Sequence, residues 1–152
     1  MRVHIIAVGR LKAGPHHALM RYYAERLAVS PTIREVEEKR PLPPPELRER
    51  EGALLLDAVP PGATIMALDE RGKTLSSEAL AQCLGRWRDD GVSDLACLIG
   101  GAEGLAEAVR RKARLVLSLG PMTWPHFLVR GMLLEQLYRA QQILAGHPYH
   151  RS

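Results

Sequence analysis

The sequence is poor in cysteine and in long apolar runs, and each shortage excludes a class of protein. Its 152 residues include only two cysteines, Cys83 and Cys97, and both stand in apolar patterns, so we expect reduced core thiols rather than a disulfide framework. No apolar run approaches the roughly 18 residues that a membrane-spanning helix needs, and the opening apolar run is too short for a signal peptide. We therefore expect a cytoplasmic protein with no membrane segment.

Metal-binding and nucleotide-binding signatures are also missing. His147 and His150 stand three apart, but Pro148 lies between them and no further ligands are near, so we expect no metal site. The segment 100–104 reads GGAEG, which matches neither G-x-G-x-x-G nor a P-loop, because no Gly-Lys-Ser/Thr follows. Triphosphate binding is therefore disfavoured.

Lysine is scarce among the basic residues. The net charge is +4, and of 21 basic residues only four are lysines. Arginine suits contacts with RNA phosphates and bases, and a positive charge permits an anionic partner. Genome base composition or heat adaptation is the alternative explanation, and the charge taken alone favours it.

Apolar runs alternate with helical patterns along the whole chain. We expect strands at 3–8, 32–37, 63–68, 95–99 and 113–119, and helices at 16–27, 46–58, 76–90, 105–112 and 127–145. This order predicts an α/β fold, in one domain spanning 1–152, with a mostly parallel sheet covered by helices on both faces and with 32–37 as an edge strand that has one wet face. Ligands bind outside the carboxyl ends of such strands, which indicates the loops after Leu68, Ile99 and Leu119.

Each of these loops has two interpretations. The glycines of 100–104 admit a ligand close to the backbone, or they merely form a tight turn. The segment 120–125, fixed by prolines at both ends, can hold an adenine against Trp124, or it packs Trp124 into the core. Asp69 and Glu70 are either acids that bind a ribose or solvated loop carboxylates.

The carboxyl-terminal tail gathers reactive groups behind a long helix. Residues 147–152 read HPYHRS, and these side chains can move protons, stack on a base and grip a phosphate. Glu135 and Arg139 on the preceding helix share a face. They are either an isolated surface ion pair or a pair that positions the tail or the substrate.

Four segments together resemble the RlmH family of the SPOUT superfamily. They are LIGGAEGL at 98–105, TWPHFLVR at 123–130, EQLYRA at 135–140 and HPYHR at 147–151. The similarity covers essentially the whole chain, although Ala102 stands where the family often has proline. The resemblance implies a methyltransferase that modifies N3 of a pseudouridine in helix 69 of 23S ribosomal RNA in the 70S ribosome.

The resemblance also implies a fold and a site. The carboxyl-terminal segment would be threaded into a trefoil knot, and the protein would be a homodimer in which one subunit's tail completes the partner's active site. The tail would be pinned at its root, with residues 150–152 mobile until RNA arrives. The S-adenosylmethionine pocket would be lined by Leu68, Gly101, Gly120, Pro121, Met122, Thr123, Trp124 and Pro125.

The tail supplies the candidate catalytic groups. His150 is the first candidate for the base that deprotonates N3; Arg151 would stabilise the developing anion or hold a phosphate, and Tyr149 would stack on the pseudouridine or hydrogen-bond to it. Glu135, Arg139 and Arg130 would support them. Two other functions stay open: a non-catalytic RNA-binding or ribosome-binding factor with this fold, and a SPOUT enzyme that acts on another RNA.

Overall fold

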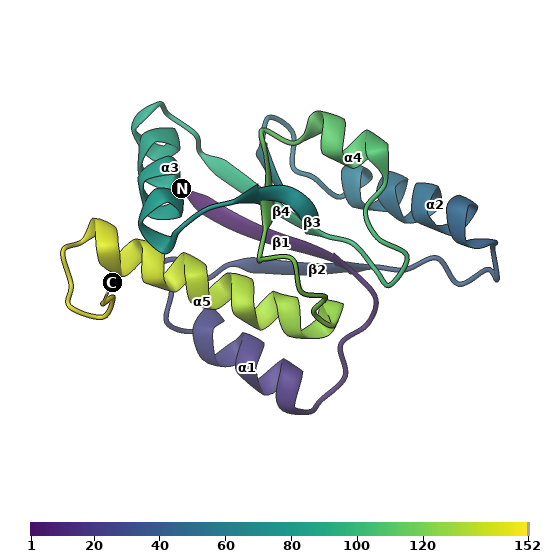
Figure 1. The fold of residues 1–152 in the computed structure, drawn as a ribbon, viewed down its shortest axis with the longest axis horizontal. Helices are drawn as coiled ribbons and strands as arrows, with labels where there is room; N and C mark the ends of the chain where they lie inside the picture. Colours follow the sequence, from purple (N-terminus) through teal and green to yellow (C-terminus); the bar gives the residue numbers. More distant parts are fainter. Residues whose placement is uncertain (152) are drawn as a thin grey trace.

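A five-stranded, all-parallel sheet forms the centre of the computed structural model, which describes residues 1–151 (Figure 1). Strands and helices alternate in the predicted order, and the strands lie side by side as β2-β1-β4-β3-β5. The fold class is thus confirmed. The strands are β1 Arg2–Val8, β2 Thr32–Val36, β3 Thr64–Thr74, β4 Asp94–Ile99 and β5 Leu115–Ser118, and the helices are α1 Pro15–Ala24, α2 Pro44–Asp57, α3 Ser77–Asp89, α4 Glu107–Lys112 and α5 His126–Leu144.

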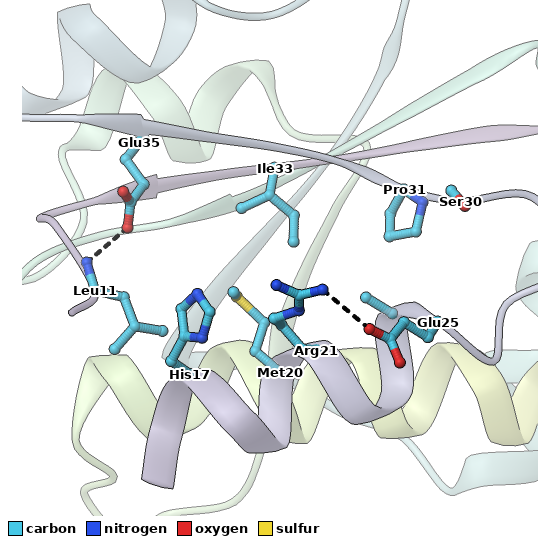
Figure 2. Close-up of a pocket in the computed structure, with 10 residues that line it drawn as sticks. Leu11, His17, Met20, Arg21, Glu25, Ser30, Pro31, Ile33 and Glu35 are labelled. Carbon is cyan, nitrogen blue, oxygen red and sulfur yellow. Dashed lines mark hydrogen bonds and ion pairs between the residues drawn. The ribbon is translucent and has the colours of Figure 1, made fainter. Parts of the chain in front are cut away.

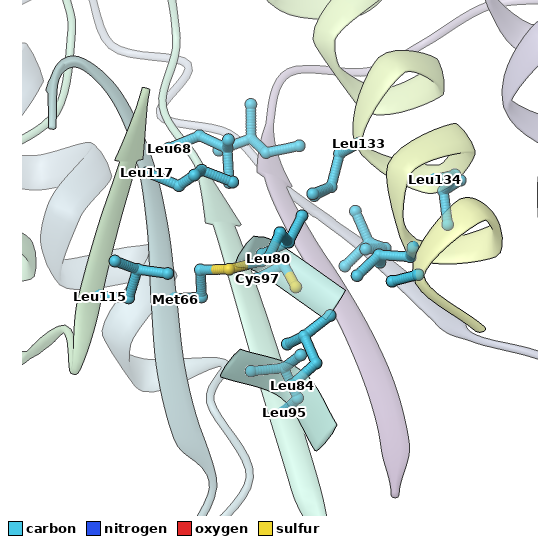
Figure 3. Close-up of a cluster of buried hydrophobic side chains, with 14 of the residues drawn as sticks. Met66, Leu68, Leu80, Leu84, Leu95, Cys97, Leu115, Leu117, Leu133 and Leu134 are labelled. Carbon is cyan, nitrogen blue, oxygen red and sulfur yellow. The ribbon is translucent and has the colours of Figure 1, made fainter. Parts of the chain in front are cut away.

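Helices cover both faces of the sheet, because the strands are apolar on both sides. Neighbouring residues alternate between two cores: Met66 packs in one and Ala67 in the other, and Cys97 and Leu98 divide in the same way. One core lies under α1, α3 and α5, and Figure 3 shows Leu80 and Leu84 of α3 beside the leucines of α5. The smaller core lies under α2 and α4. Both cysteines are free thiols.

The predicted loop after Leu68 is wrong, because β3 continues through it to Thr74. The register shifts between Leu68 and Lys73, after which Lys73 pairs with Leu117 of β5. Gly72 makes this possible: a Cβ at that position would lie 2.5 Å from the Val116 carbonyl oxygen. The polar residues at 69–73 therefore form an irregular strand extension instead of a free loop.

The edge strand β2 is where the sequence predicts it, but the face that was expected to be buried is exposed to solvent. Residues 32–35 are all exposed. A groove of about 430 Å³ separates β2 from α1, and Figure 2 shows Ile33 and Glu35 facing Met20 and His17 across it. The helix stops at Ala24 rather than at residue 27, and so it does not seal this face.

The helices α3 and α5 begin and end within one residue of the bounds that the sequence predicts. Ser76 caps α3 by accepting a hydrogen bond from the Ala79 amide at 3.1 Å, as the sequence indicates. The last helix, α5, packs against both α1 and α3 and ends one residue earlier than predicted, at Leu144.

Within residues 1–151, no helix has both the length and the apolar character to cross a membrane.

Candidate active site

A cavity of about 840 Å³ opens at the carboxyl ends of β4 and β5 and at the register shift of β3, and we call it the cradle. Three segments distant in sequence meet there, as expected from the rule for parallel sheets. Of the eight predicted cofactor-binding residues, Pro121 is not part of the lining, whereas the other seven line the cradle: Leu68, Gly101, Gly120, Met122, Thr123, Trp124 and Pro125. The structure thus gathers these seven, and their role in binding stays a prediction.

The glycine loop after β4 is both a tight turn and a wall of the cradle. The Gly104 amide donates to the Gly101 carbonyl oxygen at 3.1 Å, and Gly104 has a φ of +87°, which favours glycine. A Cβ on Gly101 would lie 2.9 Å from a methyl of Val8 and 3.2 Å from a carboxyl oxygen of Glu51. Any side chain at Gly101 would therefore displace the loop that faces the cavity.

The segment 120–125 holds its aromatic side chain at the surface, so the alternative of Trp124 as a core residue is wrong. The Trp124 side chain is 39% exposed and the Met122 side chain 68% exposed. The indole Nε1 donates to the Leu119 carbonyl oxygen at 3.3 Å, and the Ser118 hydroxyl accepts the Gly120 amide at 3.1 Å. The loop thus presents an apolar wall to the cradle on a fixed backbone.

Asp69 lines the cradle but is not a solvated carboxylate. Its side chain is largely buried, pairs with the Arg110 guanidinium and accepts the Arg71 amide at 3.0 Å. Burial alone would raise the pKa of Asp69, but the Arg71 amide and Arg110 together hold that pKa below its usual value. Glu70 is exposed at the rim.

The Glu135–Arg139 pair holds the tail, so its interpretation as an isolated surface pair is wrong. One carboxylate oxygen of Glu135 accepts Arg139 Nη2 at 2.5 Å and the Tyr149 hydroxyl at 3.1 Å. The Arg139 guanidinium also lies 4.9 Å from the centre of the Tyr149 ring. Burial, followed by the hydrogen bond to Glu135, raises the pKa of Tyr149 to about 12. The Tyr149 phenol therefore stays protonated at neutral pH.

The imidazole of His150 has both nitrogens occupied. Arg139 Nη1 lies 3.1 Å from His150 Nδ1, and Glu78 Oε1 lies 2.8 Å from His150 Nε2. Since a guanidinium only donates hydrogen bonds, Nδ1 accepts and the ring hydrogen of the neutral form lies on Nε2. His150 holds the pKa of Glu78 below its usual value. Arg151 is exposed at the end of the tail, and Ser152 lies outside the described residues.

The tail and the cradle lie at opposite ends of α5, so a single chain does not bring them together (Figure 1). The cradle loop precedes the 19-residue helix and the tail follows it, and at 1.5 Å per residue the helix spans about 28 Å. A second cavity, of about 520 Å³, lies along α5 and is lined by Gly120, Met132 and Glu135 among others. Glu135 and Arg139, both on α5, are the predicted catalytic residues between the two ends, and Glu135 lines this second cavity.

Arg130 is a buried structural cation and not an accessible support for the substrate. Its side chain is 0% exposed. It donates to Glu35 Oε2 at 2.5 Å and to the carbonyl oxygens of Val8 and Gly9 at 3.1 and 2.8 Å. Arg130 therefore ties the start of α5 to the carboxyl end of β1.

The sequence does not identify Glu51 or Glu78. Glu78 meets His150 across a separation of 72 positions, and no spacing in the sequence connects them. Glu51 stands on α2 among other charged residues, yet its side chain is buried. In the part of the chain that the structure describes, no three His, Cys, Asp or Glu side chains are grouped so that they could hold a metal ion.

Known proteins resemble this chain along its full length. The family described as "Predicted SPOUT methyltransferase" matches residues 1–150. A protein from Rhodospirillum centenum, named ribosomal RNA large subunit methyltransferase H, is 59% identical over 152 residues, which is the whole of both chains. A protein of the same name from Rhodospirillum rubrum is 50% identical, also over the whole of both chains.

Solved structures share the fold at low sequence identity. A probable methylase family protein from Haemophilus influenzae has a TM-score of 0.56 at 10% identity, covering 99% of this chain and 70% of its own. The SpoU methyltransferase AviRb from Streptomyces viridochromogenes, solved with AdoMet, has a TM-score of 0.51 at 12% identity, covering 95% of this chain and 58% of its own. Fold and full-length relatives agree: the chain belongs to the SPOUT methyltransferase family, in the group of the ribosomal RNA large subunit methyltransferase H proteins.

Proposed function

We propose that this chain uses S-adenosylmethionine to methylate N3 of a pseudouridine in helix 69 of 23S ribosomal RNA, as a cytoplasmic homodimer acting on the 70S ribosome. One observation carries the proposal: seven residues nominated for the cofactor line one cavity, in a chain that is 59% identical to a ribosomal RNA large subunit methyltransferase H. The curated relatives' name supports a ribosomal RNA substrate, and the pseudouridine N3 target is the finer part of the proposal.

The cradle suits S-adenosylmethionine in size and chemistry. Its volume of about 840 Å³ lies within the range of small-molecule sites. Met122 and Trp124 offer an apolar wall for an adenine, and the glycine loop offers backbone groups that no side chain shields. When bound, the cofactor supplies a methyl group on a sulfonium, whose departure needs no proton. The protein must therefore align N3 and make it nucleophilic.

His150 is the proposed base for N3, which lies between two carbonyl groups and keeps its proton at neutral pH. The lone pair of His150 is on Nδ1 and is bonded to Arg139, so His150 must leave Arg139 before it accepts a proton. Glu78 on Nε2 then stabilises the imidazolium that forms. Arg151, exposed beside it, is placed to hold the developing anion or a phosphate.

The composite site follows from the length of α5. About 28 Å of helix separates the tail from the cradle of the same chain, and proton transfer needs direct hydrogen-bond contact or one bridging water. We infer that Tyr149, His150 and Arg151 of one subunit serve the cradle of its partner. The trefoil knot stays a prediction from the family.

Single-turnover methylation of 70S ribosomes by His150→Ala tests the base. The expected result is a rate lower by roughly 10²–10⁴-fold, with S-adenosylmethionine affinity unchanged by calorimetry, because the proposed role of His150 is to take the proton from N3 and not to hold the cofactor. Arg34→Ala, an exposed change on β2, is the control. An unchanged rate would exclude His150 as the base. If the wild-type protein binds no cofactor, a non-catalytic RNA-binding factor replaces the whole proposal.

Mixed dimers test the composite site. A subunit with Gly101→Val has a blocked cradle, and a subunit lacking 147–152 has no catalytic tail. Their heterodimer retains one intact cradle opposite one intact tail, so we expect partial activity where each homodimer has none. Heterodimers that form without any activity would refute the sharing of sites. Methylation of 70S, 50S and naked RNA, with mapping of the modified base, identifies the substrate.

A further inference from the structure

We propose that Glu51, an acid packed behind the glycine loop, senses the charge of the ligand in the cradle, because a cationic sulfonium there favours its ionised form over its neutral form. It thereby favours S-adenosylmethionine over the uncharged thioether of the product, S-adenosylhomocysteine. The inference rests on the proposed cofactor, and it adds a specificity residue on α2.

One oxygen of the Glu51 carboxyl group, Oε1, is buried without a partner in residues 1–151. The residue is 9% exposed, and Glu51 Oε1 is shielded from solvent with no hydrogen-bond partner in residues 1–151. An ionised carboxylate is costly in such a place unless a charge or donor compensates it. Burial, and after it the negative charge of Glu103, raises the pKa of Glu51. Both effects favour the neutral form of Glu51, and a positive charge nearby would act in the opposite direction.

Glu51 lies directly behind the wall of the cradle. Its two carboxyl oxygens are 3.2 and 3.3 Å from the position that a Cβ of Gly101 would occupy. Gly101 lines the cavity whereas Glu51 does not, so the glycine loop lies between the carboxyl group and the ligand. Charges separated by so little low-dielectric protein interact strongly, because water does not screen them.

The charged groups around Glu51 leave it uncompensated. Arg48, one turn earlier on α2, aims its guanidinium at the Glu103 carbonyl oxygen at 3.5 Å and lines the cradle. Arg50 is paired with Glu38 at 2.9 Å. The next residue, Gly52, packs on apolar groups of α4 and the turn before it, and β1 contributes the Val8 methyl. Within residues 1–151 no salt bridge reaches Glu51, so a cation in the cradle would be its counter-charge.

This arrangement distinguishes substrate from product by one charge. Two unit charges about 10 Å apart at an effective dielectric of about 20 attract strongly enough to change an affinity on the order of tenfold. The attraction is present for the sulfonium and absent after the methyl group has left. Glu51 would therefore weaken the hold on the product and assist its release.

Calorimetry in two buffers with different ionisation enthalpies tests the proposal. We expect wild-type protein to release a fraction of a proton on binding S-adenosylmethionine and almost none on binding S-adenosylhomocysteine. Glu51→Gln should abolish that release and lower the preference for S-adenosylmethionine on the order of tenfold. Glu49→Gln is the matched control, since Glu49 is an exposed acid on the same helix that does not line the cradle, and it should leave the release intact.

Two results would overturn the charge sensor while leaving the proposed function in place. One is equal proton release by the wild type and Glu51→Gln. The other needs no variant and is a wild-type preference for S-adenosylmethionine over S-adenosylhomocysteine that does not change with pH. The proposal expects this preference to rise with pH as Glu51 ionises. A wild-type protein that binds neither ligand would instead reject the proposed cofactor.

Discussion

Replacing Arg130 by methionine tests whether this arginine supports the fold or the substrate. The methionine side chain would keep most of the length but lose every hydrogen bond to Glu35, Val8 and Gly9. Breaking a buried ion pair costs about 3–5 kcal/mol. The Glu35 side chain is 34% exposed and can be rehydrated, so the lower end, about 3 kcal/mol, applies. With a urea m-value of about 2 kcal/mol/M, the unfolding midpoint should fall by about 1.5 M.

Arg139→Met is the matched control for this experiment. Its side chain is 24% exposed and is paired within a single helix, so its loss should cost about 1 kcal/mol or less. It should nevertheless abolish methylation, because Arg139 holds His150 and Tyr149. Equal urea midpoints for the two variants, with loss of activity confined to Arg130→Met, would refute the structural role of Arg130.

Three further predictions concern the cradle and the tail. Gly101→Ala should weaken cofactor binding in calorimetry, because its Cβ would press on Val8 and Glu51; wild-type affinity would contradict this. Burial raises the pKa of Glu51, so the folded protein loses stability as the pH rises through that pKa and the carboxyl group ionises. Glu51→Gln cannot ionise and should therefore be more thermally stable than the wild type at alkaline pH. A stability gain at acidic pH alone would contradict the raised pKa. Arg139→Met should convert the single Nε2–H tautomer expected for neutral His150 into a mixture, because nothing else holds Nδ1 as an acceptor in residues 1–151; ¹⁵N NMR distinguishes the tautomers, and an unchanged spectrum argues against the contact.

The order of strands and helices could be predicted from the sequence, because it depends on local signals. Prolines or glycines stand at most of the boundaries between apolar runs, and Ser76 caps its helix as expected. The end of β3 could not be predicted in this way. Residues 69–73 have the composition of a loop, and they join the sheet only because Gly72 lies close against Val116 of a distant strand.

The cradle was predictable from the same signals, since ligand sites of parallel sheets follow the carboxyl ends of strands. The burial of charged side chains was not. Arg130 and Glu51 have the same residue types as their exposed neighbours, and only the tertiary packing of β1, α2 and α5 decides which of them lose water. Glu78 meets the tail solely because α3 packs beside α5.

Three charged groups, Arg130, the Glu135–Arg139 pair and Glu51, differ in how completely a neighbouring charge balances their own. This difference distinguishes the groups that support the fold from those proposed to act in function. Arg130 has Glu35 as its counter-charge and two carbonyl oxygens as acceptors, and only its Nε lacks a partner in residues 1–151. The Glu135–Arg139 pair is matched internally yet still binds Tyr149 and His150 at the surface, so it can exchange those contacts for RNA. Glu51 has no matching charge within residues 1–151. An unpaired donor on Arg130 costs little beside the counter-charge that Glu35 supplies, whereas an acid without a counter-charge behind the glycine loop is the arrangement on which the proposed role of Glu51 rests.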